Sequence, residues 1–501
     1  MTSPRTFFGH PGGLSTLFMT EMWERFSYYG IRGLLVLYMA APLASGGFGF
    51  DRAEASAIYG IYAASVYLAS LPGGWVADRW LGLQRAVFVG GVLIALGHLA
   101  IGLSAAFEQA AFFLGLVLIV LGTGLLKGNV SALVGGLYPE GGARQDAGFS
   151  IFYMGINTGA FIAPLITGFL GEKIGWHWGF GTAGLGMLVG LFVFRAQARP
   201  RLGENGLHPS GTPAEQARAR TISLAGFALA FLVVILAMLG VFRPDPVAIA
   251  GNMSTIMLTM SALYFAYLFF FAGLTTDEKK RVAVIMVLFV FSMFFWGAFE
   301  QAPTSLNLFA ADFTDRSLFG WEMPISWLQS LNSLFVILFA PVLAIVWERL
   351  GARGRNPSSP TKFAVALIGA GLGFWLMVNA ADRVAASGGT LKVSVWWLTA
   401  SYFLQSIGEL CLSPVGLSSM ILLAPKRFVG QMMGVWFTSI ALGNLFAGIV
   451  GGDVDPNQLN AMPDLFRRTA YALFLAAAVL AVLIVPIRRM MTDKAASPPR
   501  G

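Results

Sequence analysis

Long apolar stretches recur along almost the whole chain and are separated by short polar turns. The lengths of these stretches and the positions of helix-breaking residues divide them into fourteen predicted helices. The predicted helices cover residues 14–42, 55–78, 85–104, 111–138, 148–171, 178–195, 221–241, 252–274, 281–311, 324–350, 362–379, 394–424, 427–451 and 464–489. Helices of this length can cross a hydrocarbon core of about 30 Å. The pattern therefore predicts an all-α integral membrane protein.

A row of polar residues interrupts the first predicted helix. The row consists of Glu21, Glu24, Arg25, Tyr28, Tyr29 and Arg32. Spacings of three and four residues place all six on one helical face. A charge at mid-membrane costs roughly 2.5 to 3.5 kcal/mol on insertion scales, so we expect this face to point into a helix bundle and away from lipid. A functional site is the favoured interpretation, and a structural ladder of ion pairs is the alternative.

Composition supports many membrane spans and no soluble catalytic domain. The 501 residues are 56% hydrophobic, with a mean hydropathy of +0.70, and only 12% are charged, against about 25% in soluble domains. The single cysteine, Cys411, excludes an intramolecular disulfide. The sequence has no Walker loop, GxSxG elbow, HExxH or CxxC motif. We therefore expect neither an enzyme nor an ATP-driven pump, and no metal or cofactor.

The net charge of +8 could indicate a nucleic-acid partner, but its distribution along the chain does not. With the N-terminus inside, 22 of the Lys and Arg residues fall in inside loops and tails, 8 in outside loops and 3 within helices. An excess of basic residues in cytoplasmic loops is the usual pattern of membrane proteins. The distribution predicts a multi-pass membrane protein with both termini cytoplasmic. We expect the protein in the inner (plasma) membrane.

A faint internal repeat suggests how the helices are grouped. An acid, an arginine, a glycine and a further arginine follow one another at Asp78–Arg85 and again at Glu348–Arg355. If 221–241 and 252–274 are an insertion, the other twelve helices divide into six plus six. The expected domains are 1–195, 196–280 and 281–501, with a polar linker at Arg195–Arg220. The alternative is that both basic turns simply follow the preference for cytoplasmic positive charge.

Charged residues deep inside the predicted helices form a small set. The acids are Glu21, Glu24, Glu300 and Glu409, and the bases are Arg25, Arg32 and Lys127. Each base can pair with one carboxylate, which leaves one acid over. Desolvation disfavours the charged form of such a group, so it is a candidate proton carrier. The mid-helix amides of Asn157 and Asn332 could bind a ligand or join helices by hydrogen bonds.

Five sequence blocks resemble signatures of the proton-coupled oligopeptide transporter family, within the major facilitator superfamily. Glu21–Gly30 is similar to its ExxERFxYYG signature, Gly73–Gly82 to its GGxxADxxxG block, Gly124–Asn129 to its fourth-helix lysine motif, Phe152–Gly159 to its FYxxINxG signature, and Phe295–Gln301 to its seventh-helix block. The chain departs from the family pattern at Gly128, where proline is usual, and at Ala160–Phe161, where Ser-Leu is common.

The resemblance implies a facilitator fold of two six-helix bundles. Bacterial members often carry two extra helices between the halves, which makes fourteen in total. The implied function is import of di- and tripeptides with protons by alternating access, as a monomer in the lipid bilayer and without a nucleic-acid partner.

The resemblance also assigns roles to individual residues. Proton coupling falls to Glu21, Glu24, Arg25, Lys127 and Glu300, with Glu300 paired to Arg32. Arg32 and Lys127 would bind the carboxylate of the peptide. Glu409, Asn157 and Asn332 would bind its amino terminus. The pockets for the peptide side chains would be lined by Tyr28, Tyr29, Tyr67, Trp296, Ser413 and Trp436.

Two other functions remain as alternatives. A related carrier could move another small anion, such as nitrate, with protons, and a nutrient sensor could bind a ligand without transporting it. An intact Glu21–Arg25 block and Glu409 favour a peptide, because a simple anion needs no buried acid to bind an amine. The coupling residues would have no purpose in a sensor.

Overall fold

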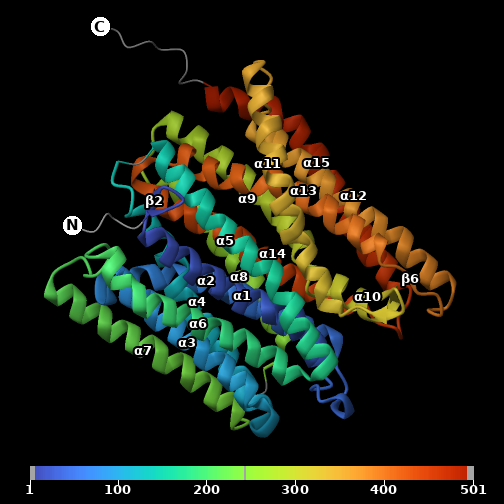
Figure 1. Ribbon diagram of the computed structural model, residues 1–501. Coiled ribbons are helices and arrows are strands. Elements are labelled where there is room, and N and C mark those ends of the chain that lie inside the picture. Colours follow the sequence, from blue (N-terminus) through green and yellow to red (C-terminus); the bar gives the residue numbers. More distant parts are fainter. Residues whose placement is uncertain (1–5, 141, 242–243, 493–501) are drawn as a thin grey trace. The chain divides into compact units, whose positions relative to one another are not determined.

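The computed structural model describes residues 6–140, 142–241 and 244–492, and these residues are predominantly helical (Figure 1). The helices are α1 (Gly13–Ala40), α2 (Arg52–Val76), α3 (Leu83–Gly102), α4 (Ser104–Gly135), α5 (Gly142–Phe169), α6 (Trp176–Leu202), α7 (Pro213–Met238), α8 (Pro246–Phe270), α9 (Thr276–Phe299), α10 (Ser305–Phe313), α11 (Ser330–Ala352), α12 (Ser359–Ala386), α13 (Trp396–Leu423), α14 (Val429–Val450) and α15 (Ala461–Thr492). The predicted bases Arg5, Arg243, Lys494 and Arg500 lie outside the described residues.

Short strands form three two-stranded ribbons within the described residues. Strands β1 (Thr6–Phe7) and β2 (His10–Pro11) are antiparallel, as are β4 (Ser317–Leu318) and β5 (Trp321–Glu322). Strands β3 (Thr314–Asp315) and β6 (Val393–Ser394) are parallel.

Twelve helical segments of the described chain are long and apolar enough to cross a membrane, and they correspond to α3–α9 and α11–α15. Only 11% of the most apolar window of α7 and 22% of that of α8 is buried, against 67% for α9. Exposed apolar side chains on helices of this length suit contact with lipid. The prediction of an all-α, multi-span membrane protein is confirmed.

The chain forms two compact units, and each includes one short segment from the half of the sequence that mainly forms the other unit. The first unit comprises Met1–Phe50, Ser65–Asp245 and Met323–Ser333, and the second comprises Asp51–Ala64, Pro246–Glu322 and Leu334–Gly501. The beginning of α2 thus belongs to the second unit and the remainder of α2 to the first. The predicted division at residues 195 and 280 stays a prediction, with α7 in the first unit and α8 in the second.

In the first unit, α1 packs against α5 and α6, and α3 packs against α4 and α6. The side chain of Glu172, in the π-helical turn Leu170–Ile174, accepts hydrogen bonds from the backbone N–H groups of Ile325 and Ser326 at 2.6 and 2.8 Å. The indole N–H of Trp327 donates to the carbonyl of Leu165 at 2.9 Å. These contacts explain why the segment Met323–Ser333 belongs to the first unit.

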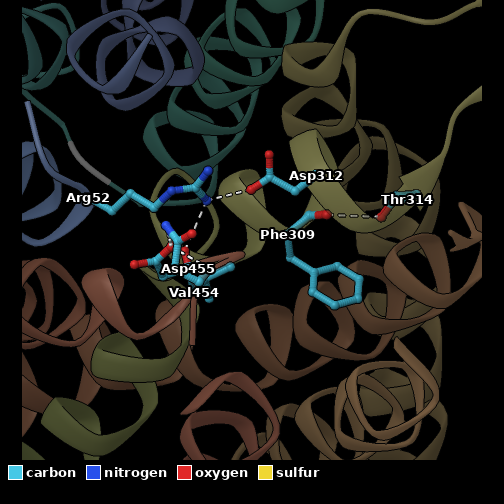
Figure 2. Close-up of polar contacts among 7 residues, drawn as sticks. Arg52, Phe309, Asp312, Thr314, Val454 and Asp455 are labelled. Atoms are coloured by element: carbon cyan, nitrogen blue, oxygen red, sulfur yellow. Dashed lines mark hydrogen bonds and ion pairs between the residues drawn. The ribbon is translucent and has the colours of Figure 1, made fainter. Parts of the chain in front are cut away.

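In the second unit, α12 packs against α13 and α15, and α14 packs against α9. Figure 2 shows how the start of α2 is held there. The guanidinium of Arg52 lies 2.5 Å from a carboxylate oxygen of Asp312 and donates to the carbonyl of Val454 at 3.0 Å. In the same view, the hydroxyl of Thr314 donates to the carbonyl of Phe309 at 3.3 Å, at the end of α10.

The structure corrects several boundaries predicted from the sequence. The predicted helix 281–311 is broken, because α9 ends at Phe299 and α10 begins at Ser305. Pro303 explains the break, since it has no N–H and its ring would clash with a helical carbonyl four residues back. The predicted linker is largely helical, with α6 continuing to Leu202 and α7 beginning after a capping box at Thr212. Within α4, the non-helical Glu108 (φ 52°, ψ −141°) separates a short segment, 104–107, from the long helix, which begins close to the predicted residue 111.

Candidate functional site

The charged face of α1 is a buried ion-pair cluster in the first unit. Nε of Arg25 lies 3.3 Å from a carboxylate oxygen of Glu21, and both Nε and Nη2 donate to Glu24, the latter at 2.6 Å. Glu21, Glu24 and Arg25 are 3%, 1% and 4% exposed. Removing such charges from water is costly, and the close pairing compensates for much of that cost. One arginine is therefore shared by two carboxylates.

Glu21 is the less satisfied of the two acids. Its Oε2 atom is buried and makes no hydrogen bond within the part of the chain that the structure describes. Lys127 of α4 lies close enough to attract Glu21 electrostatically. A buried oxygen without a hydrogen bond is costly when it carries charge, so the charge of Glu21 is less well compensated than that of Glu24.

A tyrosine ring covers each of the three mid-helix bases. The pairs are Arg25 with Tyr28, Arg32 with Tyr29 and Lys127 with Tyr67, with the charged group 5.1, 5.5 and 3.9 Å from the ring centroid. These distances suit cation–π interactions. The sequence interpretation missed this role of the tyrosines. Two pairs could have been found from their three-residue spacing on α1, but the third joins α2 to α4 and gives no such signal.

Both candidate amides belong to the first unit as well. Asn157 lies in α5, is 8% exposed, and donates from Nδ2 to the carbonyl of Tyr153 at 3.1 Å. Asn332 lies near the start of α11, inside the segment Met323–Ser333, and is half-buried. The first unit therefore holds all three bases and both amides of the predicted site.

In the second unit, Glu300 occupies a different position from the mid-helix one that was predicted. It is the C-terminal cap of α9 and is buried. The next residue, Gln301, accepts a hydrogen bond from the hydroxyl of Ser305 at 2.8 Å and so helps to form the turn into α10. A carboxylate at a helix C-terminus gains nothing from the helix dipole.

Two tryptophans form an aromatic wall in the second unit. Trp296 of α9 and Trp436 of α14 are buried, with ring centroids 6.5 Å apart and planes at 80°. A Cβ at Gly416 would collide with the ring of Trp436, and one at Gly443 would collide with Cβ and the backbone of Trp296. Gly416 thus makes room for the Trp436 ring, and Gly443 allows α14 to approach the backbone of α9 closely. The sequence interpretation missed both roles. Glu409 and Ser413 lie on α13 and are half-buried.

The predicted site residues therefore divide between the units. The first unit carries Glu21, Glu24, Arg25, Tyr28, Tyr29, Arg32, Tyr67, Lys127, Asn157 and Asn332, and the second carries Trp296, Glu300, Glu409, Ser413 and Trp436. The pairing of Glu300 with Arg32 stays a prediction. Within the described ranges, no group of three or more potential side-chain ligands could hold a metal ion.

Comparison with known proteins identifies the family. Residues 84–461 match the model of the POT family. The chain belongs to the POT family. It is 52% identical over 495 residues to the peptide transporter YePEPT of Yersinia enterocolitica subsp. palearctica serotype O:3 (strain YE-P4), covering 98% of this chain and 97% of that protein. It is 36% identical to a di-/tripeptide transporter of Lactococcus lactis subsp. cremoris, over 98% of each chain.

The fold of the POT family agrees with this assignment. A crystal structure of a POT family transporter in complex with a thioalcohol conjugated peptide matches with a TM-score of 0.87 and 34% identity, over 97% of this chain and 98% of that one. POT family membership, predicted from the sequence, is confirmed. The chain is a multi-pass membrane protein of a transporter family and not an enzyme.

Proposed function

We propose that this POT family member is a proton-coupled symporter that imports di- and tripeptides by alternating access. The observation that carries the proposal is that residues deep within the helices supply both signs of charge. Arg32 and Lys127 are basic, and Glu409 is acidic. A free peptide carries a carboxylate and an ammonium group, so it requires both signs of charge for recognition. The peptide transporters among the relatives support the same substrate class.

Arg32 and Lys127 bind the peptide carboxylate in this proposal, and Glu409 binds the ammonium group together with Asn157 and Asn332. The tyrosine rings over the two bases limit the directions from which an anion can approach them. Recognition through the two ends of the peptide makes binding largely independent of the peptide's side chains. The side chains of the peptide would contact the aromatic and hydroxyl groups of Tyr28, Tyr29, Tyr67, Trp296, Ser413 and Trp436.

Proton coupling uses Glu21, Glu24, Arg25, Lys127 and Glu300. Because Arg25 contacts two carboxylates, a proton can neutralise one of them while the arginine keeps a partner in the other. Such an arrangement lets the cluster take up and release a proton without leaving the buried arginine unpaired. Glu300 exchanges its proton as its pairing with Arg32 forms and breaks.

The proposed topology has fourteen spans. Twelve of them form two six-helix bundles, and α7 and α8 are the two extra helices. Helices α1 and α2 are 28 and 25 residues long, which gives about 42 and 38 Å at 1.5 Å per residue. Both termini are cytoplasmic and the protein lies in the inner membrane, in keeping with the distribution of Lys and Arg. The parts are 1–195, 196–280 and 281–501, and the protein acts as a monomer.

The test is uptake of labelled dialanine into proteoliposomes with and without an inward proton gradient. We expect accumulation above the external concentration only with the gradient, and its loss when a protonophore is added. Labelled nitrate serves as the second substrate. Accumulation of nitrate but not dialanine would favour the anion carrier, and dialanine binding without flux would favour a sensor. Either result would overturn the proposal.

A further inference from the structure

The β4–β5 hairpin ends in an unusual turn. Ser317 is paired with Glu322 and Leu318 with Trp321, which leaves Phe319 and Gly320 as a two-residue loop. Both loop residues have positive φ, 53° and 80°. A two-residue hairpin loop with two positive φ values is the type I′ pattern, in which Asn-Gly, Asp-Gly and Gly-Gly are preferred. A phenylalanine thus occupies a position that its backbone preferences disfavour.

Burial within the chain does not compensate for this conformation, because the side chain of Phe319 is fully exposed. Positive φ is uncommon for residues other than glycine, and Asn, Asp and His are the usual exceptions. Neither local geometry nor packing within the described chain therefore favours phenylalanine at this tip. An exposed aromatic ring at such a position suits contact with something outside the chain.

The same turn occurs a second time in the protein. In the β1–β2 ribbon, Thr6 is paired with Pro11 and Phe7 with His10, and the loop is Phe8–Gly9. The φ values of Phe8 and Gly9 are 50° and 78°, and Phe8 is exposed. This hairpin directly precedes α1 in the first unit. An exposed Phe-Gly tip thus appears once in each unit.

The β4–β5 hairpin starts close to the end of a membrane span. Strand β3 ends at Asp315, two residues before Ser317, and pairs with β6, in which Ser394 is the partner of Asp315. The segment that spans the membrane as α13 begins only two residues after Ser394, at the exposed Trp396. The base of the hairpin is therefore held beside the first residues of α13, a helix long and apolar enough to cross a membrane. Tryptophan, the residue at position 396, is enriched where membrane spans meet the lipid interface.

Charge and apolar surface are separated along the hairpin. At its base, Arg316 forms an ion pair with Glu322 at 2.7 Å. The backbone N–H of Ser317 donates to Asp315 at 2.9 Å and holds the pKa of that carboxyl below its usual range. The tip is apolar, with exposed Leu318, Phe319 and Trp321. A charged base and an exposed apolar tip suit an element that crosses from water into a lipid interface.

We propose that the β4–β5 hairpin inserts its tip into the interfacial region of the adjacent lipid leaflet. Phe319 and the side chains of Leu318 and Trp321 enter the lipid, while the buried Arg316 and its exposed partner Glu322 stay at the base of the hairpin. The occupant of this apolar surface is the bilayer that surrounds the neighbouring spans. The hairpin thereby anchors one end of the second unit to the membrane surface.

Site-directed spin labelling in liposomes tests the depth of the tip. Cys411 is the single cysteine and is buried, so Cys411→Ser gives a background for nitroxides at Phe319→Cys and, as a matched control, at Ser317→Cys. Oxygen concentrates in lipid and a charged nickel chelate stays in water. We expect the label at 319 to collide more with oxygen, and the label at 317 more with nickel. Equal access of nickel at both positions would overturn the proposal, as would a label at 319 shielded from both reagents, which would place the tip against protein.

A second variant distinguishes the effect of the phenylalanine ring from the effect of the turn conformation. Phe319→Asn keeps a residue suited to the type I′ loop and removes the apolar ring. A nitroxide at Leu318→Cys reports the depth of the hairpin with and without this substitution. We expect the oxygen preference of that label to be lost in the Phe319→Asn variant, with its side-chain mobility showing that the hairpin remains folded. An unchanged oxygen preference would show that Phe319 is not the anchor.

Discussion

The two units hold their site residues in opposite ways. In the first unit, two buried acids share Arg25, and each of the three bases lies over a tyrosine ring. In the second unit, Glu300 caps α9 and Glu409 lies on α13, and the rings of Trp296 and Trp436 pack edge to face. Charges of the first unit thus stabilise each other, so their removal should affect folding. We expect removal of an acid from the second unit to affect transport more than folding.

The strongest test of this contrast is Glu300→Gln. We expect it to abolish gradient-driven uptake of labelled dialanine, because the amide cannot release a proton, while some peptide counterflow remains. Asp464→Asn is a matched control, since that acid lies on the exposed surface of the same unit. Unchanged concentrative uptake in Glu300→Gln would remove this residue from the proton path.

The next test concerns the stability of the first unit. Arg25→Met leaves Glu21 and Glu24 buried without the arginine they share, and breaking a buried pair in this way costs roughly 3 to 5 kcal/mol. We expect a large fall in the thermal unfolding temperature of the purified protein. Arg25→Lys keeps the charge but loses the two-point contact with Glu24, so its fall should be smaller. Equal stability of Arg25→Met and the wild type would contradict a self-compensating cluster.

A smaller effect is expected at Glu409, where the change is in binding. An N-acetylated dipeptide lacks the ammonium group, and losing one charge-assisted hydrogen bond weakens affinity by about tenfold to a hundredfold. We expect this penalty in the wild type and a much smaller one in Glu409→Gln. Competition of dialanine and its acetylated form against labelled dialanine measures both. An undiminished penalty in the variant would place the amine site elsewhere.

The smallest effect should come from the pair that holds the start of α2 in the second unit. The side chains of Arg52 and Asp312 are 23% and 25% exposed, so water weakens their attraction, and the coupling energy should be about 1 kcal/mol or less. A double-mutant cycle with Arg52→Gln and Asp312→Asn, read by thermal unfolding, measures it. If this coupling energy equalled the loss of stability in Arg25→Met, ion pairs would stabilise both units to the same extent. The proposed difference between the units would then be wrong.

Periodicity and motifs predicted the polar face of α1 well, because residues three and four apart on a helix share a face whatever surrounds it. They failed at Glu300, where Pro303 ends α9 although the apolar pattern continues to residue 311. They also missed Gly416 and Gly443, whose importance depends on the Trp436 ring and the α9 backbone, which other parts of the chain bring to them.

The sequence by itself determined the membrane class, the helical pattern, the charged face of α1 and the POT family. These features follow from local spacing, length and composition. Only the tertiary structure decided that the start of α2 belongs to the second unit and Met323–Ser333 to the first. Arg52 reaches a partner 260 positions away, and Glu172 contacts a backbone N–H 153 positions away. Such contacts leave no periodic signal, because the hydrophobic pattern states which face of a helix is buried but not which partner covers it.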